Sequence, residues 1–283
     1  MPKSQIIISI LAVALIFGMY LLPKVVIDNE RNIAVQEEHF EGDGHDHSGM
    51  AGSTDVLGAV HDRELTEEEQ TRITNLRENF YNSKDKEKSA KFADSLALAF
   101  RTVGKYDSAA KYSEVVAEIY PQDENFIKAG DNYFDAFSYS VEPEVMGRYG
   151  EKARNYYSKL LKSKPGMLDI KNRMAMTYVA TTSPMQGIIL LREVLESDPV
   201  NEQAMFNLGI LSIQSRQYDK AIERLEKLVS IYPENLQAQF YLGVSYFESG
   251  EKQKAKKLFE LVKSKDNDPS LQATVNNYLE EIK

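Results

Sequence analysis

The residues best suited to chemistry are four histidines, which all lie in the first quarter of the chain. They are His39, His45, His47 and His61, and the acids Glu41, Asp43 and Asp46 lie among them. Imidazole and carboxylate groups at such short spacing are potential ligands of a divalent metal ion. The same stretch is rich in glycine and poor in large apolar residues, which is typical of a flexible linker. The sequence leaves both interpretations open and favours the solvated linker, because ordering such a tract around an ion costs entropy.

The rest of the chain offers few groups for catalysis. No histidine follows His61, and the chain contains no cysteine. A Ser-His-Asp triad, a Cys-His pair and a His/Cys zinc site therefore cannot form beyond that point, and no Gly-rich phosphate loop is present. Paired carboxylates are an alternative, because Asp and Glu are abundant, but a run such as Glu67–Glu69 is more typical of a solvated helix start. We expect no enzyme, no cofactor and, at a net charge of −9, no nucleic-acid binding.

The first 64 residues divide into a tail (1–5), an apolar run (6–27) and the histidine-bearing linker (28–64). Ile6 to Leu22 is interrupted only by Ser9 and Gly18. As a helix this stretch spans about 25 Å, the short end of a membrane span, and the next apolar residues can extend it. The run ends without the small-x-small site of a cleaved signal peptide. The sequence therefore predicts an uncleaved anchor, with a cleaved signal peptide and a buried core helix as alternatives.

Orientation in the membrane is weakly determined, because basic residues lie on both sides of the apolar run. An amino-terminal tail of only five residues most simply stays in the cytosol. We therefore expect the bulk of the chain to be exported, which in a bacterium places it in the periplasm, tethered to the inner membrane.

The segment from about 166 to 268 repeats itself every 34 residues. In each unit a small residue is followed twelve positions later by a second one. The pairs are Ala175/Gly187, Gly209/Ala221 and Gly243/Ala255. A fixed period of this length predicts an array of helical hairpins, and the small residues allow the two antiparallel helices of a hairpin to cross closely.

These positions resemble the tetratricopeptide repeat family. The residues that follow its pattern best are Leu242, Gly243, Tyr246, Gly250, Ala255 and Phe259. The chain departs from the pattern in having no tryptophan, in Ser212 at a usually aromatic position, and in Asn267 at the closing proline. The resemblance implies an all-α solenoid of helix-turn-helix units, which binds other proteins and carries no chemistry of its own.

The resemblance divides residues 65–283 into an N-terminal helix (65–82), five repeats and a C-terminal capping helix (269–283). The repeats are expected at about 87–121, 122–165, 166–199, 200–233 and 234–268. A capping box at Thr66 to Glu69 starts the first helix, and Asp268 with Pro269 starts the last. Asn201 and Asn235 are suited to cap the first helices of two repeats.

The second repeat is irregular. The small pair of the first repeat, Ala97/Ala109, has the usual spacing, but Gly130 and Ala153 are 23 residues apart. Eleven residues have been added within Asp131–Arg148, among many aromatic residues. The addition predicts either a longer first helix whose rings pack on its neighbours or a protruding element that binds a partner.

In the family, positions five, nine and twelve of each first helix usually face a concave groove. The resemblance assigns to this groove Met176, Val179, Phe206, Ile210, Ile213, Phe240, Val244 and Phe247. An apolar lining suits an amphipathic helix or an extended apolar peptide. It also means that the basic clamp with which some members bind a terminal carboxylate is missing. The alternative is that neighbouring helices or the terminal helix already cover these residues.

The expected function is that of a membrane-tethered, extracytoplasmic scaffold that binds partner proteins or peptides during complex assembly or chaperoning. The layout is similar to tetratricopeptide repeat factors of cytochrome c maturation, which hold apocytochrome, and to anchored chaperones of the secretion machinery. Neither similarity has a diagnostic motif. A self-associating assembly protein is a second alternative, and an enzyme that uses carboxylates is a third.

Overall fold

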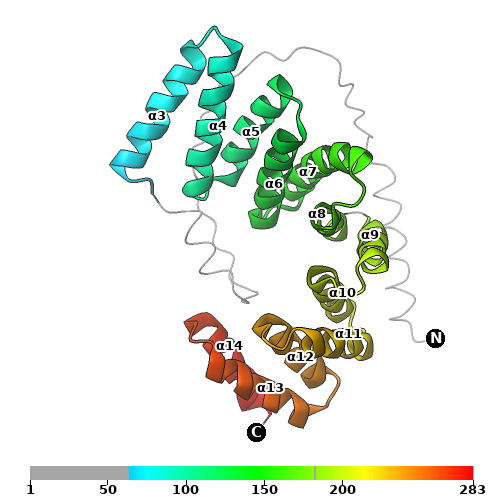
Figure 1. Cartoon of the computed structure of the whole chain (residues 1–283). Coiled ribbons are helices and arrows are strands. Elements are labelled where there is room, and N and C mark those ends of the chain that lie inside the picture. The colour runs from blue at the N-terminus through cyan, green and yellow to red at the C-terminus, as the bar shows by residue number, and fades with distance from the viewer. Residues whose placement is uncertain (1–63, 182, 283) are drawn as a thin grey trace, which may run out of the picture. The chain divides into compact units, whose positions relative to one another are not determined.

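The computed structural model describes residues 64–181 and 183–282, all of them in one compact unit of the chain. Over these ranges the chain forms twelve α-helices and no strand (Figure 1). They are α3 (Glu67–Asn82), α4 (Lys86–Thr102), α5 (Tyr106–Ile119), α6 (Asp123–Tyr139), α7 (Pro143–Ser163), α8 (Leu168–Val179), α9 (Pro184–Ser197), α10 (Glu202–Gln214), α11 (Tyr218–Ile231), α12 (Leu236–Glu248), α13 (Lys252–Lys265) and α14 (Pro269–Glu281). None of these twelve helices is long and apolar enough to cross a membrane. The apolar run and the linker that holds the histidines lie outside the described residues.

Successive helices pack against each other in chain order (Figure 1). The hairpins are α4–α5, α6–α7, α8–α9, α10–α11 and α12–α13, and each hairpin packs on the next. The first helices also contact one another, α6 with α8, α8 with α10, and α10 with α12. The first helices therefore share one face of the stack, while α3 and α14 pack on α4 and α13 at its two ends. The predicted all-helical array of hairpins is confirmed.

The turn inside three of the hairpins contains a residue with positive φ at the same position of the repeat. These residues are Gly104 (77°), Arg216 (56°) and Gly250 (89°). In each turn the next residue donates its backbone N–H to a carbonyl five residues earlier. The three bonds are Lys105 to Phe100 at 2.9 Å, Gln217 to Ser212 at 2.8 Å and Glu251 to Tyr246 at 2.8 Å. This left-handed turn satisfies carbonyl groups that the end of an α-helix leaves without partners.

The helix starts follow the capping signals of the sequence. Thr66 Oγ1 accepts a hydrogen bond from the backbone N–H of Glu69, and Glu69 Oε2 accepts one from the backbone N–H of Thr66. The predicted capping box is therefore present. Asn201 and Asn235 cap α10 and α12 as predicted. Asp268 caps α14, with Pro269 at its first position.

The small residues of the five hairpins are all buried. They are Ala97, Ala109, Gly130, Ala153, Ala175, Gly187, Gly209, Ala221, Gly243 and Ala255. A Cβ atom at Gly209 would lie 2.7 Å from Leu225 Cδ2, and one at Gly243 would lie 2.8 Å from Phe259 Cε1. A Cβ atom at Gly187 would lie 2.5 Å from the backbone oxygen of Ala175. Where the first helix has a glycine at the crossing, a large side chain of the second helix fills the space. This side chain, Leu225 or Phe259, lies one turn after the small alanine of that helix.

The extra residues of the second repeat lengthen both of its helices. α6 has 17 residues and α7 has 21, whereas α10 has 13 and α11 has 14. The expectation of a longer first helix alone is therefore incomplete, because Pro143 at the first helical position begins α7 early. The ring of Tyr139, at the end of α6, stacks on Tyr106 of α5 with ring centroids 4.7 Å apart. Between the two helices, Val141 is 90% exposed.

Candidate partner-binding face

Four first helices present a side chain at position nine of the family's first helix. These side chains are Leu98 on α4, Asp131 on α6, Met176 on α8 and Ile210 on α10, here called the first-helix row. Leu98 is 60% exposed, and the other three are half-buried. The three apolar members belong to none of the clusters that make up the described apolar core. They therefore keep apolar surface that the fold itself does not use.

The other residues predicted to line the groove belong to the core clusters or pack against them. Val179 lies at the crossing of α8 and α9, where its Cγ2 atom is 2.6 Å from the position of a Cβ atom on Gly187. Phe206 and Tyr241 make an edge-to-face contact with ring centroids 5.7 Å apart. Ile213 packs half-buried against the core cluster that contains Leu242 and Phe259. Val244, at position nine of the first helix in the last repeat, is buried.

The terminal helix packs on the last repeat through the buried Val275 and through the ring of Tyr278. Tyr278 of α14 lies edge-on to Phe240 and Phe247 of α12, with ring centroids 6.2 and 5.2 Å apart. It also stacks on Phe259 of α13 at 4.8 Å. Part of the predicted groove is therefore in contact with the protein's own C-terminal helix. A partner lying along the first helices would have to end at α10 or displace α14.

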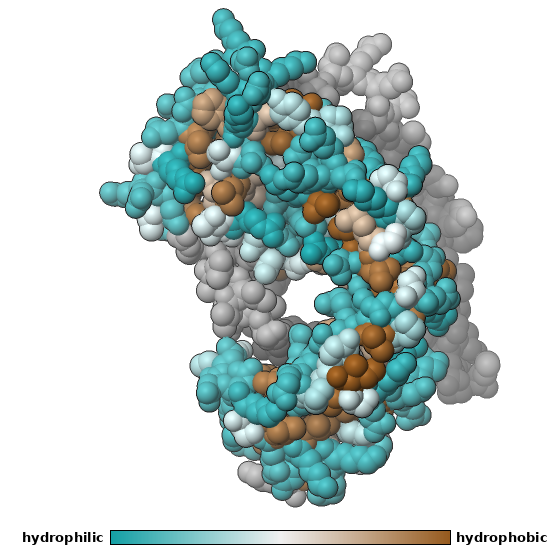
Figure 2. Space-filling view, in the orientation of Figure 1, coloured by the Kyte–Doolittle hydropathy of each residue, from teal (hydrophilic) through white to brown (hydrophobic). Residues whose placement is uncertain are grey.

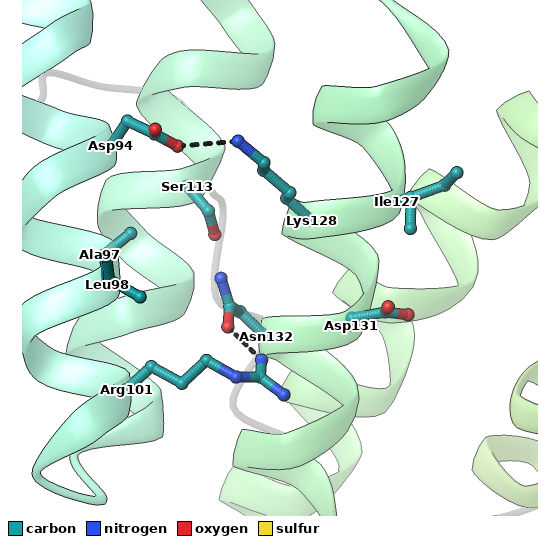
Figure 3. A pocket seen from close by; sticks show the side chains of 9 residues that line it. All are labelled: Asp94, Ala97, Leu98, Arg101, Ser113, Ile127, Lys128, Asp131 and Asn132. Atoms are coloured by element: carbon teal, nitrogen blue, oxygen red, sulfur yellow. Dashed lines mark hydrogen bonds and ion pairs between the residues drawn. The ribbon is translucent and has the colours of Figure 1, made fainter.

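A pocket of about 320 Å³ lies between α4 and α6 at the other end of the row (Figure 3). It is lined by Asp94, Ala97, Leu98, Arg101, Ser113, Ile127, Lys128, Asp131 and Asn132. Figure 3 shows Lys128 and Asn132 pointing from α6 towards α4, whereas Ile127 and Asp131 lie on the other side of α6. The exposed Leu98 thus has charged and amide groups beside it.

The polar groups of the pocket differ in how firmly they are held. Arg101 Nη1 donates to Oδ1 of the buried Asn132 at 2.5 Å, and Arg101 Nη2 lies 2.6 Å from Asp135 Oδ2. Lys128 Nζ lies 3.1 Å from Asp94 Oδ1, but these two side chains are 44% and 51% exposed. An exposed ion pair contributes only about 0–1 kcal/mol. Breaking the ion pair between Lys128 and Asp94 in order to bind a partner would therefore cost little free energy. Arg101, by contrast, is held in place by Asn132 and Asp135.

Two acids of α6, Asp131 and Asp135, are paired within the fold. Burial raises the pKa of Asp135, and the nearby Arg101 opposes that rise. Asp131 forms an ion pair with Arg173 of α8 and accepts a hydrogen bond from the Tyr157 hydroxyl of α7 at 2.9 Å. The bond to Asp131 raises the pKa of Arg173, and burial raises the pKa of Tyr157. These groups are already paired, so the pocket offers hydrogen bonds rather than a surplus of charge.

The sequence-based prediction of the groove omits these polar residues. Asp94 and Lys128 lie on the first helices of successive repeats, but they do not occupy equivalent positions, so the period alone does not pair them. Over the described residues no group of three or more His, Cys, Asp or Glu side chains is placed to hold a metal ion.

The face shown in Figure 2 is mostly hydrophilic, with apolar side chains in small, separate patches.

Comparison with known proteins supports the repeat fold. Residues 212–277 match the tetratricopeptide repeat family model. TTC0263, a thermophilic tetratricopeptide repeat protein of Thermus thermophilus, is similar in structure with a TM-score of 0.51 at 15% identity, over 68% of this chain and 99% of that one. No curated protein sequence matches the chain.

Two further solved structures are similar with lower scores. MamA of Desulfovibrio magneticus RS-1 has a TM-score of 0.48 at 20% identity, over 65% of this chain and 98% of that one. YrrB, described as having an unusual peptide-binding site, has a TM-score of 0.44 at 18% identity, over 72% of this chain and 97% of that one.

Proposed function

We propose that this tetratricopeptide repeat protein is a scaffold without enzymatic activity, which binds a segment of a partner protein along the first-helix row. The observation that carries the proposal is the apolar surface that remains at Leu98, which is exposed, and at Met176 and Ile210, which are half-buried. All three are apolar, they recur at one position of the repeat, and they lie outside the core clusters. Covering apolar surface contributes about 25 cal/mol per Å², so a partner that buries this row gains affinity without disturbing the fold.

The partner segment that fits this face is amphipathic. Its apolar side chains would contact Met176 and Ile210 on α8 and α10. Its polar or main-chain groups would reach the pocket between α4 and α6, where Lys128 and Asp94 are half-exposed. An amphipathic helix or an extended peptide meets both requirements. The segment would not pass beyond α10, because Tyr278 packs against the last repeat.

The setting that we propose is extracytoplasmic and close to a membrane. Its support comes from the sequence, in which an apolar run (6–27) is followed by a glycine-rich acidic linker (28–64). A linker of this kind allows a folded unit to reach partners near its anchor. Assembly or chaperoning of other exported proteins is the process that such a tethered scaffold would serve.

Crosslinking in intact cells, followed by identification of the attached proteins, tests the proposal. The variants are Leu98→Glu, Met176→Glu and Ile210→Glu. The matched control is Ile189→Glu, because Ile189 is 48% exposed on the second helix α9. We expect the row variants to lose the same partners that the control retains, with equal helix content by circular dichroism. Retention of every partner by all three row variants would rule out the row as the binding face.

The same variants separate the alternatives. A mass that rises with concentration, and falls back to that of a single chain in the row variants, would identify the partner as a second copy of the chain. Specific binding of apocytochrome carboxy-terminal peptides, lost in the row variants, would identify cytochrome c maturation as the process.

A further inference from the structure

Arg224 of α11 is a half-buried cation whose hydrogen bonds go only to uncharged groups. Its Nη1 atom donates to the backbone oxygen of Leu208 at 3.1 Å and to the hydroxyl group of Ser212, both on α10. Leu208 and Ser212 are buried. Arg224 forms no ion pair with any carboxylate of the described residues. The fold therefore holds a positive charge here without placing an acid in contact with it.

The hydrogen bonds of Arg224 leave one edge of its guanidinium group unused. A guanidinium group has five N–H donors, and both bonds to α10 come from Nη1. The Nε–H and Nη2–H donors have no acceptor among the described residues. These donors lie along one edge of the group and point in parallel, which is the arrangement that binds both oxygens of a carboxylate.

A second arginine lies near Arg224. Arg192 of α9 is exposed, and its side chain takes part in no hydrogen bond or ion pair with the described residues. Leu195, one turn further along α9, packs against the core cluster that contains Leu225 of α11. Burial, and after it the positive charge of Arg192, lowers the pKa of Arg224. Two like charges are therefore held close together, an arrangement that an anion between them would stabilise.

The acids of α9 and α11 do not neutralise this pair of arginines. Glu193 pairs with a lysine of α8 at 3.3 Å, and Glu226 accepts a hydrogen bond from a tyrosine of α12. Glu196 is exposed and forms no ion pair within the described part of the chain. Glu223 opposes the fall in the pKa of Arg224, but less strongly than burial and the second arginine lower it. Two arginines and Glu223 have a formal charge of +1, which matches a singly charged carboxylate better than a phosphate group.

We propose that Arg224 and Arg192 form a second binding site, which takes the side-chain carboxylate of an aspartate or glutamate in a partner protein. Arg224 binds both oxygens through its free edge, and Arg192 contacts the carboxylate from α9. The site belongs to second helices, so it is independent of the first-helix row. An acidic segment bound there leaves the row free, and the scaffold can then hold two segments at once.

Nuclear magnetic resonance of the arginine Nε–H groups tests the proposal on the full chain in a nonionic detergent. The probe is the capped tripeptide acetyl-Ala-Glu-Ala-amide, and acetyl-Ala-Gln-Ala-amide is its uncharged match. Sodium chloride keeps the ionic strength constant at about 100 mM. We expect the glutamate peptide to shift the signals of Arg192 and Arg224 to saturation, at least about fivefold further than the glutamine peptide does. Arg72, which is exposed on α3, is the internal reference and should shift with neither peptide.

The decisive variant is Arg192→Gln, because Arg224 also bonds to α10 and its replacement would disturb the hairpin. Arg192→Gln should weaken the response of Arg224 to the glutamate peptide at least about fivefold at unchanged helix content. Arg192→Lys should weaken it less, because it keeps the charge but loses the planar fork. The matched control Arg72→Gln should leave the response unaltered.

Three results would overturn the proposal. The first is an equal response of Arg224 to the two peptides, and the second is a response that Arg192→Gln leaves unchanged. The third is saturation by inorganic phosphate at a lower concentration than by the glutamate peptide, which would assign the site to phosphate groups.

Discussion

Tyr278 of α14 stacks on Phe259 of α13, with ring centroids 4.8 Å apart and ring planes 15° apart. Phe259 in turn occupies the space above Gly243 of α12, where a Cβ atom would lie 2.8 Å from its ring. A glycine, a phenylalanine and a tyrosine on three helices therefore form one continuous contact. The ring of Phe259 therefore packs both on Gly243 within the hairpin α12–α13 and on Tyr278 of the terminal helix.

Replacement of Tyr278 by alanine should destabilise the C-terminal end of the stack. The change removes three ring contacts, and we expect a loss of about 1–3 kcal/mol in the free energy of unfolding, since the ring is half-buried. Amide hydrogen exchange should accelerate in α12 to α14 more than in α3 to α6. The matched control Val141→Ala, at a side chain that is 90% exposed, should stay within about 0.5 kcal/mol. Equal stability of the two variants in urea would contradict the contact described.

The glycines of the hairpin crossings should differ in their tolerance of alanine. At Gly209 the new methyl group meets the flexible end of Leu225, but at Gly187 it meets the backbone oxygen of Ala175 at 2.5 Å. We expect Gly209→Ala to lose about 1–2 kcal/mol and Gly187→Ala about 3 kcal/mol or more, because a backbone atom cannot rotate away. Gly147→Ala in α7, with no atom within 4 Å of the added carbon, should instead gain about 0.5–1 kcal/mol. Thermal unfolding of the three variants measures the order, and a reversed order of the two crossing glycines refutes this explanation.

The hairpins could be predicted from the sequence because their determinants recur within each repeat. The small residues at the crossings and the caps Asn201 and Asn235 act on neighbours a few residues to one repeat away. The period therefore shows where the helices begin and cross. Which residue fills the space at Gly209 is harder to predict from the sequence, because the contact depends on the direction of the Leu225 side chain and not on spacing alone.

The exposure of the groove residues could not be predicted, because it depends on helices outside the repeat. Ile210 and Val244 occupy the same position in successive repeats, yet only Val244 is buried. The difference arises in the last repeat, against which α14 packs. The division of the eleven added residues between α6 and α7 likewise depends on Pro143 and on a ring contact with another hairpin.

Glu114 should make stability depend on pH. It accepts hydrogen bonds from the Tyr133 hydroxyl at 2.5 Å, Lys152 at 2.7 Å and the Tyr156 hydroxyl at 3.2 Å. Burial alone would raise the pKa of Glu114, but these bonds, with that of Lys152 first, hold the pKa below its usual value of 4.5. The carboxylate therefore stabilises the fold above about pH 4.5, and this contribution is lost as the pH falls through the lower pKa of the folded state.

The change Glu114→Gln tests this dependence. We expect a loss of about 1–3 kcal/mol at pH 7, because the buried donors lose a charged acceptor. The difference from the unchanged protein should shrink as the pH falls below 4.5 in urea unfolding experiments. The exposed Glu118 on the same helix provides the control, Glu118→Gln, which should show little effect at either pH. A difference that stays constant down to pH 3 would show that Glu114 is not held in its ionised form.

Arg216 should be replaceable by glycine with a gain in stability. Its φ of 56° lies in the left-handed region, and the same position of two other repeats is occupied by Gly104 and Gly250. A side chain disfavours this conformation by about 1–2 kcal/mol, and part of that is offset by the greater freedom of glycine in the unfolded chain. We expect Arg216→Gly to gain about 0.5–1 kcal/mol in the free energy of unfolding.

The reciprocal change Gly250→Arg isolates the backbone effect, because no atom lies within 4 Å of a Cβ atom added at Gly250. It should lose about as much as Arg216→Gly gains, since no steric contact contributes. Urea unfolding of both single variants and of the double variant measures the two effects, which should add because the residues lie in separate turns. A loss at Gly250 without a gain at Arg216 would show that the Arg216 side chain contributes an interaction that offsets its backbone conformation.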